Sequence, residues 1–159
     1  MTTLAEHAAS MIRYTAWADD RLLAAAEGLA GEQYQQIRLP LAHMLGTQRW
    51  WYSRWTGGAS IEPELVTLER AKQDYAASHD TLLACVSALT DEDWGRAGQW
   101  WLEWGFEGRM PLGESITQLF CHGVQHRSEL AVLLSEWGHS PGDLDYLIFL
   151  RDTSLPGIA

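Results

Sequence analysis

The chain of 159 residues has little cysteine, few basic side chains and no long apolar run. Its two cysteines, Cys85 and Cys121, are too few for a disulfide framework. The 11 Lys and Arg residues are outnumbered by 21 Asp and Glu residues, which gives a formal net charge of −10. Nucleic acids and anionic membrane surfaces are bound by basic faces, so this balance argues against both partners. No segment approaches the ~18 consecutive apolar residues of a membrane span.

The first ten residues, MTTLAEHAAS, have neither the basic start nor the apolar core of a secretory signal. We therefore expect a cytoplasmic protein with reduced thiols. A domain takes ~100–200 residues, so we expect residues 1–159 to form a single domain. The hydrophobic fraction of 47% is ordinary for a globular protein, whereas nine tryptophans against three phenylalanines are unusual.

Apolar residues recur at helical spacing along most of the chain. Thr3 and Glu6 have the spacing of a capping box, and Pro40 and Pro63 suit the first turn of a helix. Long helices are expected over about 3–28, 40–55, 63–89 and 112–137, with a short one over about 141–151. The pattern predicts an all-α protein, a four-helix bundle with a short C-terminal helix.

Residues 94–111 interrupt the helical pattern, because four glycines space out a tryptophan-rich segment. We expect a small irregular or hairpin insertion that turns near Gly105, preceded by a turn or short capped helix at 90–93. This connection is the longest between the long helices, so we also expect a lid or a long crossover here.

Two histidines on the last long helix are the strongest chemical signal in the sequence. His122 and His126 continue a stripe of leucines that should face the core. Residues four apart on a helix lie one above the other, so the two imidazoles could chelate one metal ion. The same pattern is found for core histidines that make one hydrogen bond, and it leaves both roles about equally open.

A metal site would need a third ligand from a neighbouring helix. His43 and His79 both lie on faces that should point inward, whereas His7 and His139 lie near a helix end and in a loop. The pattern favours His43 only slightly over His79. The reason is that the helix face of His43 also carries the following possible pocket residues: Gly46, Thr47 and Trp50.

Glu129 lies at the edge of the same face, three residues after His126. It could be a fourth ligand, a base beside a bound water, or a solvated glutamate, and the last is the commonest fate of a surface Glu. Cys121 is rotated by about 100° from His122 on a helix, so we expect it outside the ligand set. No nucleophile elbow, phosphate loop or dinucleotide fingerprint is present in the sequence.

Three segments resemble the DinB-like (YfiT-like) family of metalloenzymes, which shares its name with an unrelated DNA polymerase. They are HGVQHRSELAVLLSEWGHSPGDLDYLIFLR (122–151), LAHMLGTQRWW (41–51) and YTAWADDRLLAA (14–25). The resemblance implies a four-helix bundle that is commonly a homodimer. It also implies a metal-binding histidine triad of His43, His122 and His126, in preference to His79.

Family members of known activity transfer a low-molecular-weight thiol, such as bacillithiol, mycothiol or glutathione, onto or through an electrophile. The resemblance thus implies a metal-dependent thiol S-transferase that acts on small electrophiles in stress or detoxification. Zinc or nickel would suit the imidazoles, and iron and copper stay open. Where the family often has His-Arg-Gly-Gln, this chain ends the motif with Glu129, whose charge could alter the metal or the substrate.

Two other functions stay open. One is a metal-dependent hydrolase that uses bound water, with Glu129 as its base. The other is a non-enzymatic, metal-binding homodimeric bundle. The tryptophans at 50–55 and 100–104 are interpreted first as packing or dimer contacts, and second as a pocket over the metal that includes Trp50.

Overall fold

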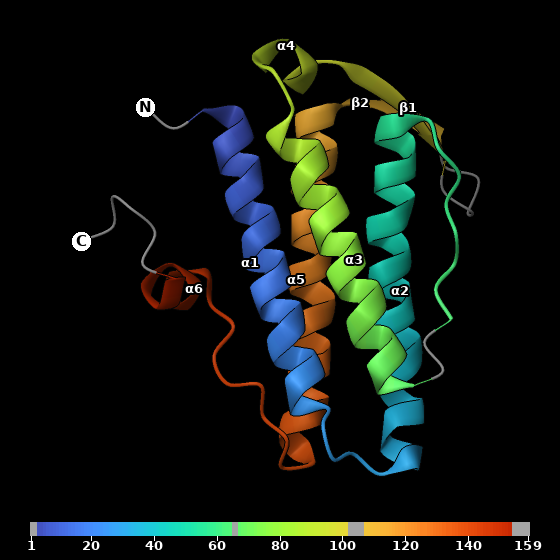
Figure 1. Cartoon of the computed structure of the whole chain (residues 1–159), viewed down its shortest axis with the longest axis vertical. Coiled ribbons are helices and arrows are strands. Elements are labelled where there is room, and N and C mark those ends of the chain that lie inside the picture. The colour runs from blue at the N-terminus through green and yellow to red at the C-terminus, as the bar shows by residue number, and fades with distance from the viewer. Residues whose placement is uncertain (1–2, 65–66, 102–106, 154–159) are drawn as a thin grey trace.

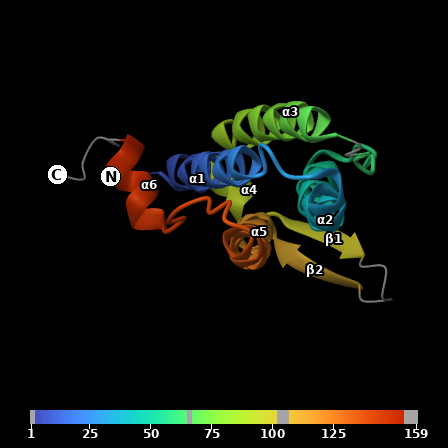
Figure 2. The same cartoon turned by 90° about the horizontal axis from the view of Figure 1, so that it is seen from below.

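The computed structural model describes residues 3–64, 67–101 and 107–153. Its four long helices form the predicted bundle (Figure 1): α1 Leu4–Ala25, α2 Gly31–Thr56, α3 Leu68–Ser87 and α5 Leu112–Glu136. Helix α1 packs against α3 and α5, and α2 packs against the same two helices (Figure 2). The all-α class predicted from the apolar stripes is therefore confirmed.

The directions of the four long helices show that the long crossover lies between α2 and α3. In Figure 1, α2 and α3 both run upward while α1 and α5 run downward, so the connection after α2 must return along the length of the bundle. The crossover expected before the last long helix is wrong, because α3 ends and α5 begins at the same end of the bundle. This return places residues 57–64 beside α2.

Helix α2 begins nine residues earlier than predicted, so Pro40 lies inside the helix rather than in its first turn. A proline in a helix interior removes one hydrogen bond and costs about 3 kcal/mol. Tyr34, Ile37 and Leu41, at helical spacing around it, are all buried in the core. Burial of these three side chains offsets that cost, because each is worth about 1.5–3 kcal/mol.

Two other helix starts also differ from the prediction. Helix α3 begins after Thr67, whose side chain accepts a hydrogen bond from the backbone N–H of Arg70, and not at Pro63. The last helix, α6 Tyr146–Thr153, begins about five residues later than predicted. Gly142 there has a φ of 77°, which interrupts a helix, and Asp145 accepts a hydrogen bond from the N–H of Leu147.

The insertion before α5 is the predicted small hairpin. After the one-turn helix α4 Asp91–Trp94, strand β1 Ala97–Trp101 pairs antiparallel with β2 Glu107–Pro111. The turn expected near Gly105 lies outside the described residues. The hairpin covers one end of the bundle, where β1 contacts α2 and β2 contacts α5. Next to the hairpin, Trp94 of α4 packs directly on Gly113 of α5. A Cβ on Gly113 would lie only 2.2 Å from the Trp94 indole nitrogen, so this packing requires glycine.

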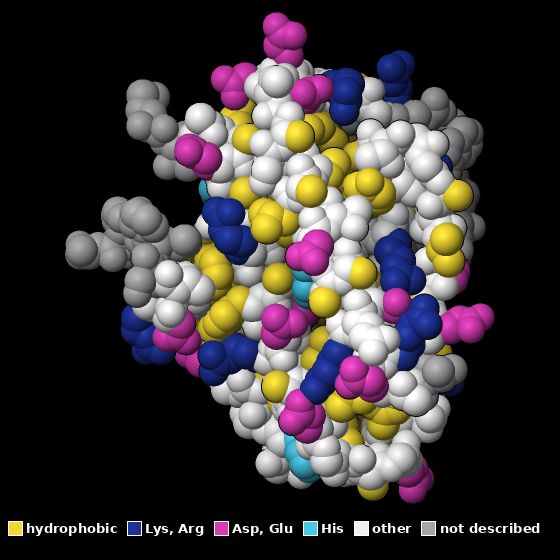
Figure 3. Space-filling view, viewed as in Figure 1, with side chains coloured by type: hydrophobic (Ala, Val, Ile, Leu, Met, Phe, Trp, Pro, Cys, Tyr) yellow, Lys and Arg dark blue, Asp and Glu magenta, His cyan; other side chains and the backbone are white. Residues whose placement is uncertain are grey.

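The surface over α1 and α3 carries interspersed acidic and basic side chains, with no continuous basic area in this view (Figure 3). None of the helices within the described residues is long and apolar enough to span a bilayer. Helix α6 packs beside α1, where the Tyr14 hydroxyl donates a 2.7 Å hydrogen bond to the Leu144 carbonyl and Phe149 is buried.

Candidate metal centre

Helices α2 and α5 bring three imidazoles together midway along the bundle. The potential ligand atoms of His43, His122 and His126 all lie within 4.8 Å of one another. The Nε2 atoms of His43 and His122 are 3.1 Å apart, and the His122 and His126 ring centroids are 4.4 Å apart. His43 is exposed, while the other two rings are partly buried. The group is therefore accessible from one side.

His79, the competing candidate for a third ligand, lies elsewhere. It is buried on α3, and its Nε2 atom donates a 2.9 Å hydrogen bond to the Asp19 carboxylate on α1. Within the described residues, His7 and His139 also lie outside the three-histidine group. The geometry thus supports His43 as the partner of the pair on α5.

The environment of the group favours the neutral form of two of its imidazoles, His43 and His122. Burial, with the neighbouring His126 and His43 rings, lowers the pKa of His122 to about 4. Partial desolvation of its ring and the neighbouring His126 also lower the pKa of His43 below its ordinary value. At neutral pH both rings therefore have a free nitrogen lone pair, which is the form that binds a metal ion.

Glu129 contacts the group through His126. The Nδ1 atom of His126 donates a 2.8 Å hydrogen bond to Glu129, which lies one turn further along α5. This bond lowers the pKa of the Glu129 carboxyl and leaves Nε2 as the free nitrogen of His126. The Glu129 side chain is 59% exposed, and it is not itself part of the ligand group. A carboxylate in this position orients a metal-binding histidine.

The three residues expected to form a pocket lie beside His43 on α2, in differing surroundings. Gly46 is buried under the connection to α3, Thr47 donates a hydrogen bond to the His43 carbonyl, and Trp50 packs edge-on against Trp51. The structure places these residues on the helix face of the group. Their role in binding a substrate stays a prediction.

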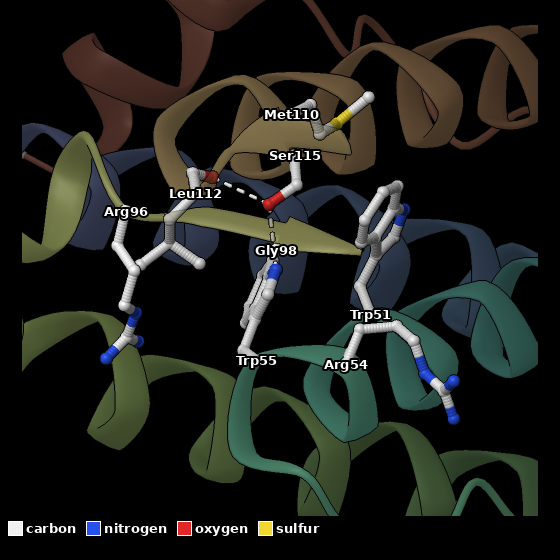
Figure 4. Close-up of a pocket in the computed structure, with 8 residues that line it drawn as sticks. All are labelled: Trp51, Arg54, Trp55, Arg96, Gly98, Met110, Leu112 and Ser115. Carbon is white, nitrogen blue, oxygen red and sulfur yellow. Dashed lines mark hydrogen bonds between the residues drawn. The ribbon is translucent and has the colours of Figure 1, made fainter. Parts of the chain in front are cut away.

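Two other tryptophans of α2 join it to α5 beneath the hairpin. Trp55 donates a 2.8 Å hydrogen bond to Ser115, and Trp51 donates a 2.6 Å hydrogen bond to Gln118, one turn before His122. Figure 4 shows the cavity beside them, of about 50 Å³, which is too small for more than a few heavy atoms. Packing is thus the role that the structure supports for Trp51 and Trp55. The side chains of residues 100–104 lie outside the described ones.

A buried ionic network next to the group was missed in the sequence. The Asp19 carboxylate accepts hydrogen bonds from Arg127, His79 and Gln48, so it links α1 to the other three long helices. Burial alone would raise the pKa of Asp19, but Arg127 and His79 hold it below its ordinary value. The available signal was the position of Asp19 on the apolar stripe of its helix, three residues before Leu22.

Arg127 has a tightly fitted site within this network. Its side chain is 1% exposed and lies against Gly123, where a Cβ would approach Nη1 to 2.8 Å. The guanidinium carbon also lies 5.3 Å from the centre of the Tyr14 ring, a cation–π distance. Because Arg127 follows His126 directly, the network fixes the rotation of α5 that turns His126 toward α2.

Comparison with known proteins agrees with the geometry. No curated protein sequence matches the chain. A family model described as DinB family matches residues 1–156, which include all three histidines of the group and the Asp19 network. The chain therefore belongs to the DinB family.

Proposed function

We propose that the protein binds a divalent metal ion through His43, His122 and His126 and is a metal-dependent thiol S-transferase acting on small electrophiles. The observation that carries the proposal is the group itself, three imidazoles from two helices with their ligand atoms within 4.8 Å. Three protein ligands and an accessible side are typical of a catalytic rather than a structural site.

The donor set fits a divalent ion. Neutral imidazole nitrogens suit zinc and nickel, which are the ions we propose, and the lowered pKa values of His43 and His122 keep these donors unprotonated. When bound, such an ion supplies Lewis acidity, which ionises a coordinating thiol at neutral pH. The protein residues would hold the ion and orient its ligands. Glu129 fixes the ring of His126, and the Arg127–Asp19 pair fixes helix α5.

The choice of thiol transfer over hydrolysis is supported by two considerations. The resemblance of the His43 and His122–Arg127 segments to the family implies thiol chemistry. In addition, the Glu129 carboxylate already accepts hydrogen bonds from His126 and Gln125, which favours an orienting role over that of a base for hydrolysis.

Thiol consumption tests this function. Metal-loaded protein is assayed with glutathione, bacillithiol or mycothiol and a panel of small electrophiles, beside His126→Ala and a control, His7→Ala, which alters an exposed histidine outside the group. We expect thiol consumption by the wild type and by His7→Ala but not by His126→Ala. Equal rates in all three would overturn the proposal, and turnover without added thiol would indicate the hydrolase instead.

We also propose a cytoplasmic homodimer whose partners are small molecules, not nucleic acid or membranes. The net charge of −10 supports the exclusion of anionic partners, and the family resemblance supports the dimer. Light scattering coupled to size exclusion measures the mass, and a value near 17.9 kDa would contradict the dimer.

A further inference from the structure

A carboxylate that the sequence did not single out lies next to the histidine group. The connection after α2 returns along that helix and carries Glu62 and Pro63 against Gly46. A Cβ built on Gly46 would lie 3.3 Å from the Glu62 carboxylate oxygen Oε2 and 3.6 Å from Pro63 Cδ. The bare backbone of Gly46 is what leaves room for the carboxylate.

Gly46 is three residues after His43, so both lie on one face of α2. The Cβ positions of residues three apart on a helix are ~5–6 Å apart, so the Glu62 carboxylate lies one helical turn along from the His43 ring. Glu62 is not among the three residues whose ligand atoms lie within 4.8 Å of one another, so its side chain would have to turn toward the imidazoles to bind the same ion.

The Glu62 carboxylate is free to make that turn. It is exposed, and within the described part of the chain it accepts no hydrogen bond and forms no ion pair. Glu129, the other carboxylate beside the histidine group, is instead engaged by His126 and Gln125. The two acidic groups therefore differ in role: one orients an imidazole, and the other has no partner.

A glycine inside a helix costs about 1 kcal/mol relative to alanine. At position 46 this cost coincides with the close approach of Glu62, whose carboxylate oxygen would have to shift by a few tenths of an ångström to admit a Cβ. The arrangement thus places an exposed acidic group about one helical turn from His43.

We propose that Glu62 is a fourth protein ligand to the divalent ion, delivered by the crossover connection between α2 and α3. The proposal rests on the metal site of the proposed function and extends its donor set to three histidines and one carboxylate. The carboxylate would neutralise one of the two charges of the ion and would favour a coordination number above four, with positions still left for a small molecule.

Binding of Co²⁺ to the metal-free protein tests the proposal, with calorimetry for affinity and visible absorption for coordination. The variants are Glu62→Gln, which removes the charge, and Gly46→Ala, whose methyl group occupies the space beside Oε2. Glu64→Gln, on the same connection and also exposed, is the matched control. Circular dichroism establishes that each variant is folded.

We expect Glu62→Gln to weaken Co²⁺ binding by ~10–100-fold, the range found when groups that support a metal site are lost, and to change its visible spectrum. Gly46→Ala, which shifts Oε2 by only a few tenths of an ångström, should have a smaller effect. Glu64→Gln should match the wild type. If Glu62→Gln keeps the wild-type affinity and spectrum while His126→Ala loses the ion, Glu62 is not a ligand although the histidine site stands. If the wild type binds no Co²⁺, the proposed metal site and the Glu62 proposal both fail.

Discussion

The Nδ1 atom of His126 lies 2.8 Å from a carboxylate oxygen of Glu129, one helical turn away on α5. This single bond determines which nitrogen of the ring is free, because the nitrogen that donates to Glu129 cannot bind an ion. His126 belongs to the group with His43 and His122, so the free Nε2 is the nitrogen that it can offer to an ion.

Replacing Glu129 with Gln should weaken zinc binding by ~10-fold, since an uncharged acceptor still orients His126 but raises the basicity of its free nitrogen less effectively. Alanine at this position should have a larger effect. Calorimetric titration with Zn²⁺ measures both, and Glu136→Gln, an exposed change on the same helix, is the control. A Gln variant that binds zinc normally but has lost all turnover would show that Glu129 is a base.

Replacing His43 should affect metal binding, whereas replacing His79 should affect stability. His43→Ala should abolish metal binding and leave stability nearly unchanged, because this side chain is exposed. His79→Ala should keep the metal but lower the free energy of unfolding by about 1–3 kcal/mol, because it removes a buried partner of Asp19. Elemental analysis and urea unfolding of both variants test this, and the reverse pattern would contradict the ligand assignment.

Replacing only one member of the Asp19–Arg127 pair should strongly lower the stability of the fold. Both side chains are 1% exposed, so Arg127→Met leaves Asp19 short of a buried counter-charge and should destabilise the fold by about 3–5 kcal/mol. Because the pKa of Asp19 is lowered in the folded protein, its contribution is present above the unfolded pKa near 4 and is lost as pH falls.

Urea unfolding at pH 7 and pH 3 measures this contribution. The double variant Asp19→Leu with Arg127→Met should regain part of the loss, since it leaves no unpaired charge. If the two single losses simply add, the two residues do not act as a pair.

Acid should destabilise the metal-free protein through His122. Its folded pKa of about 4 is below the unfolded value of 6.5, so the neutral ring favours the fold above pH 6.5, and that contribution is lost as pH falls toward 4. The full shift corresponds to about 3 kcal/mol, and solvent screening at this partly exposed ring reduces the expected change to about 1–2 kcal/mol. Thermal unfolding across this pH range measures it, and His122→Asn should flatten the profile.

The helices of the bundle could be predicted because helical spacing and capping residues are local features of the sequence. Apolar spacing gave the four long helices, and the capping box at Thr3 and Glu6 is present as predicted. The start of α2 could not be predicted from propensity, because burial of Tyr34 and Ile37 outweighs the cost of Pro40 inside the helix. Helix boundaries thus depend on tertiary contacts that a local pattern does not contain.

The candidate site could be predicted only in part, for a related reason. A helical stripe shows that His43 and His79 both face inward, but not which neighbour each one meets. The family resemblance resolved that choice. Nothing in the local pattern singled out Asp19 as a buried acid, although it is 1% exposed, and Glu62 lies on a connection whose path no periodicity describes. Pairing across helices and the course of a crossover are set by the whole bundle.

His43 and His122 stand 79 residues apart in the chain. The helix that carries the second of them is formed from the last third of the polypeptide, after α3, α4 and the hairpin. On emergence from the ribosome, therefore, the growing chain has no complete coordination sphere until α5 is exposed and docked. The ion would bind only after α5 has docked, and a chain truncated before α5 should not bind the metal.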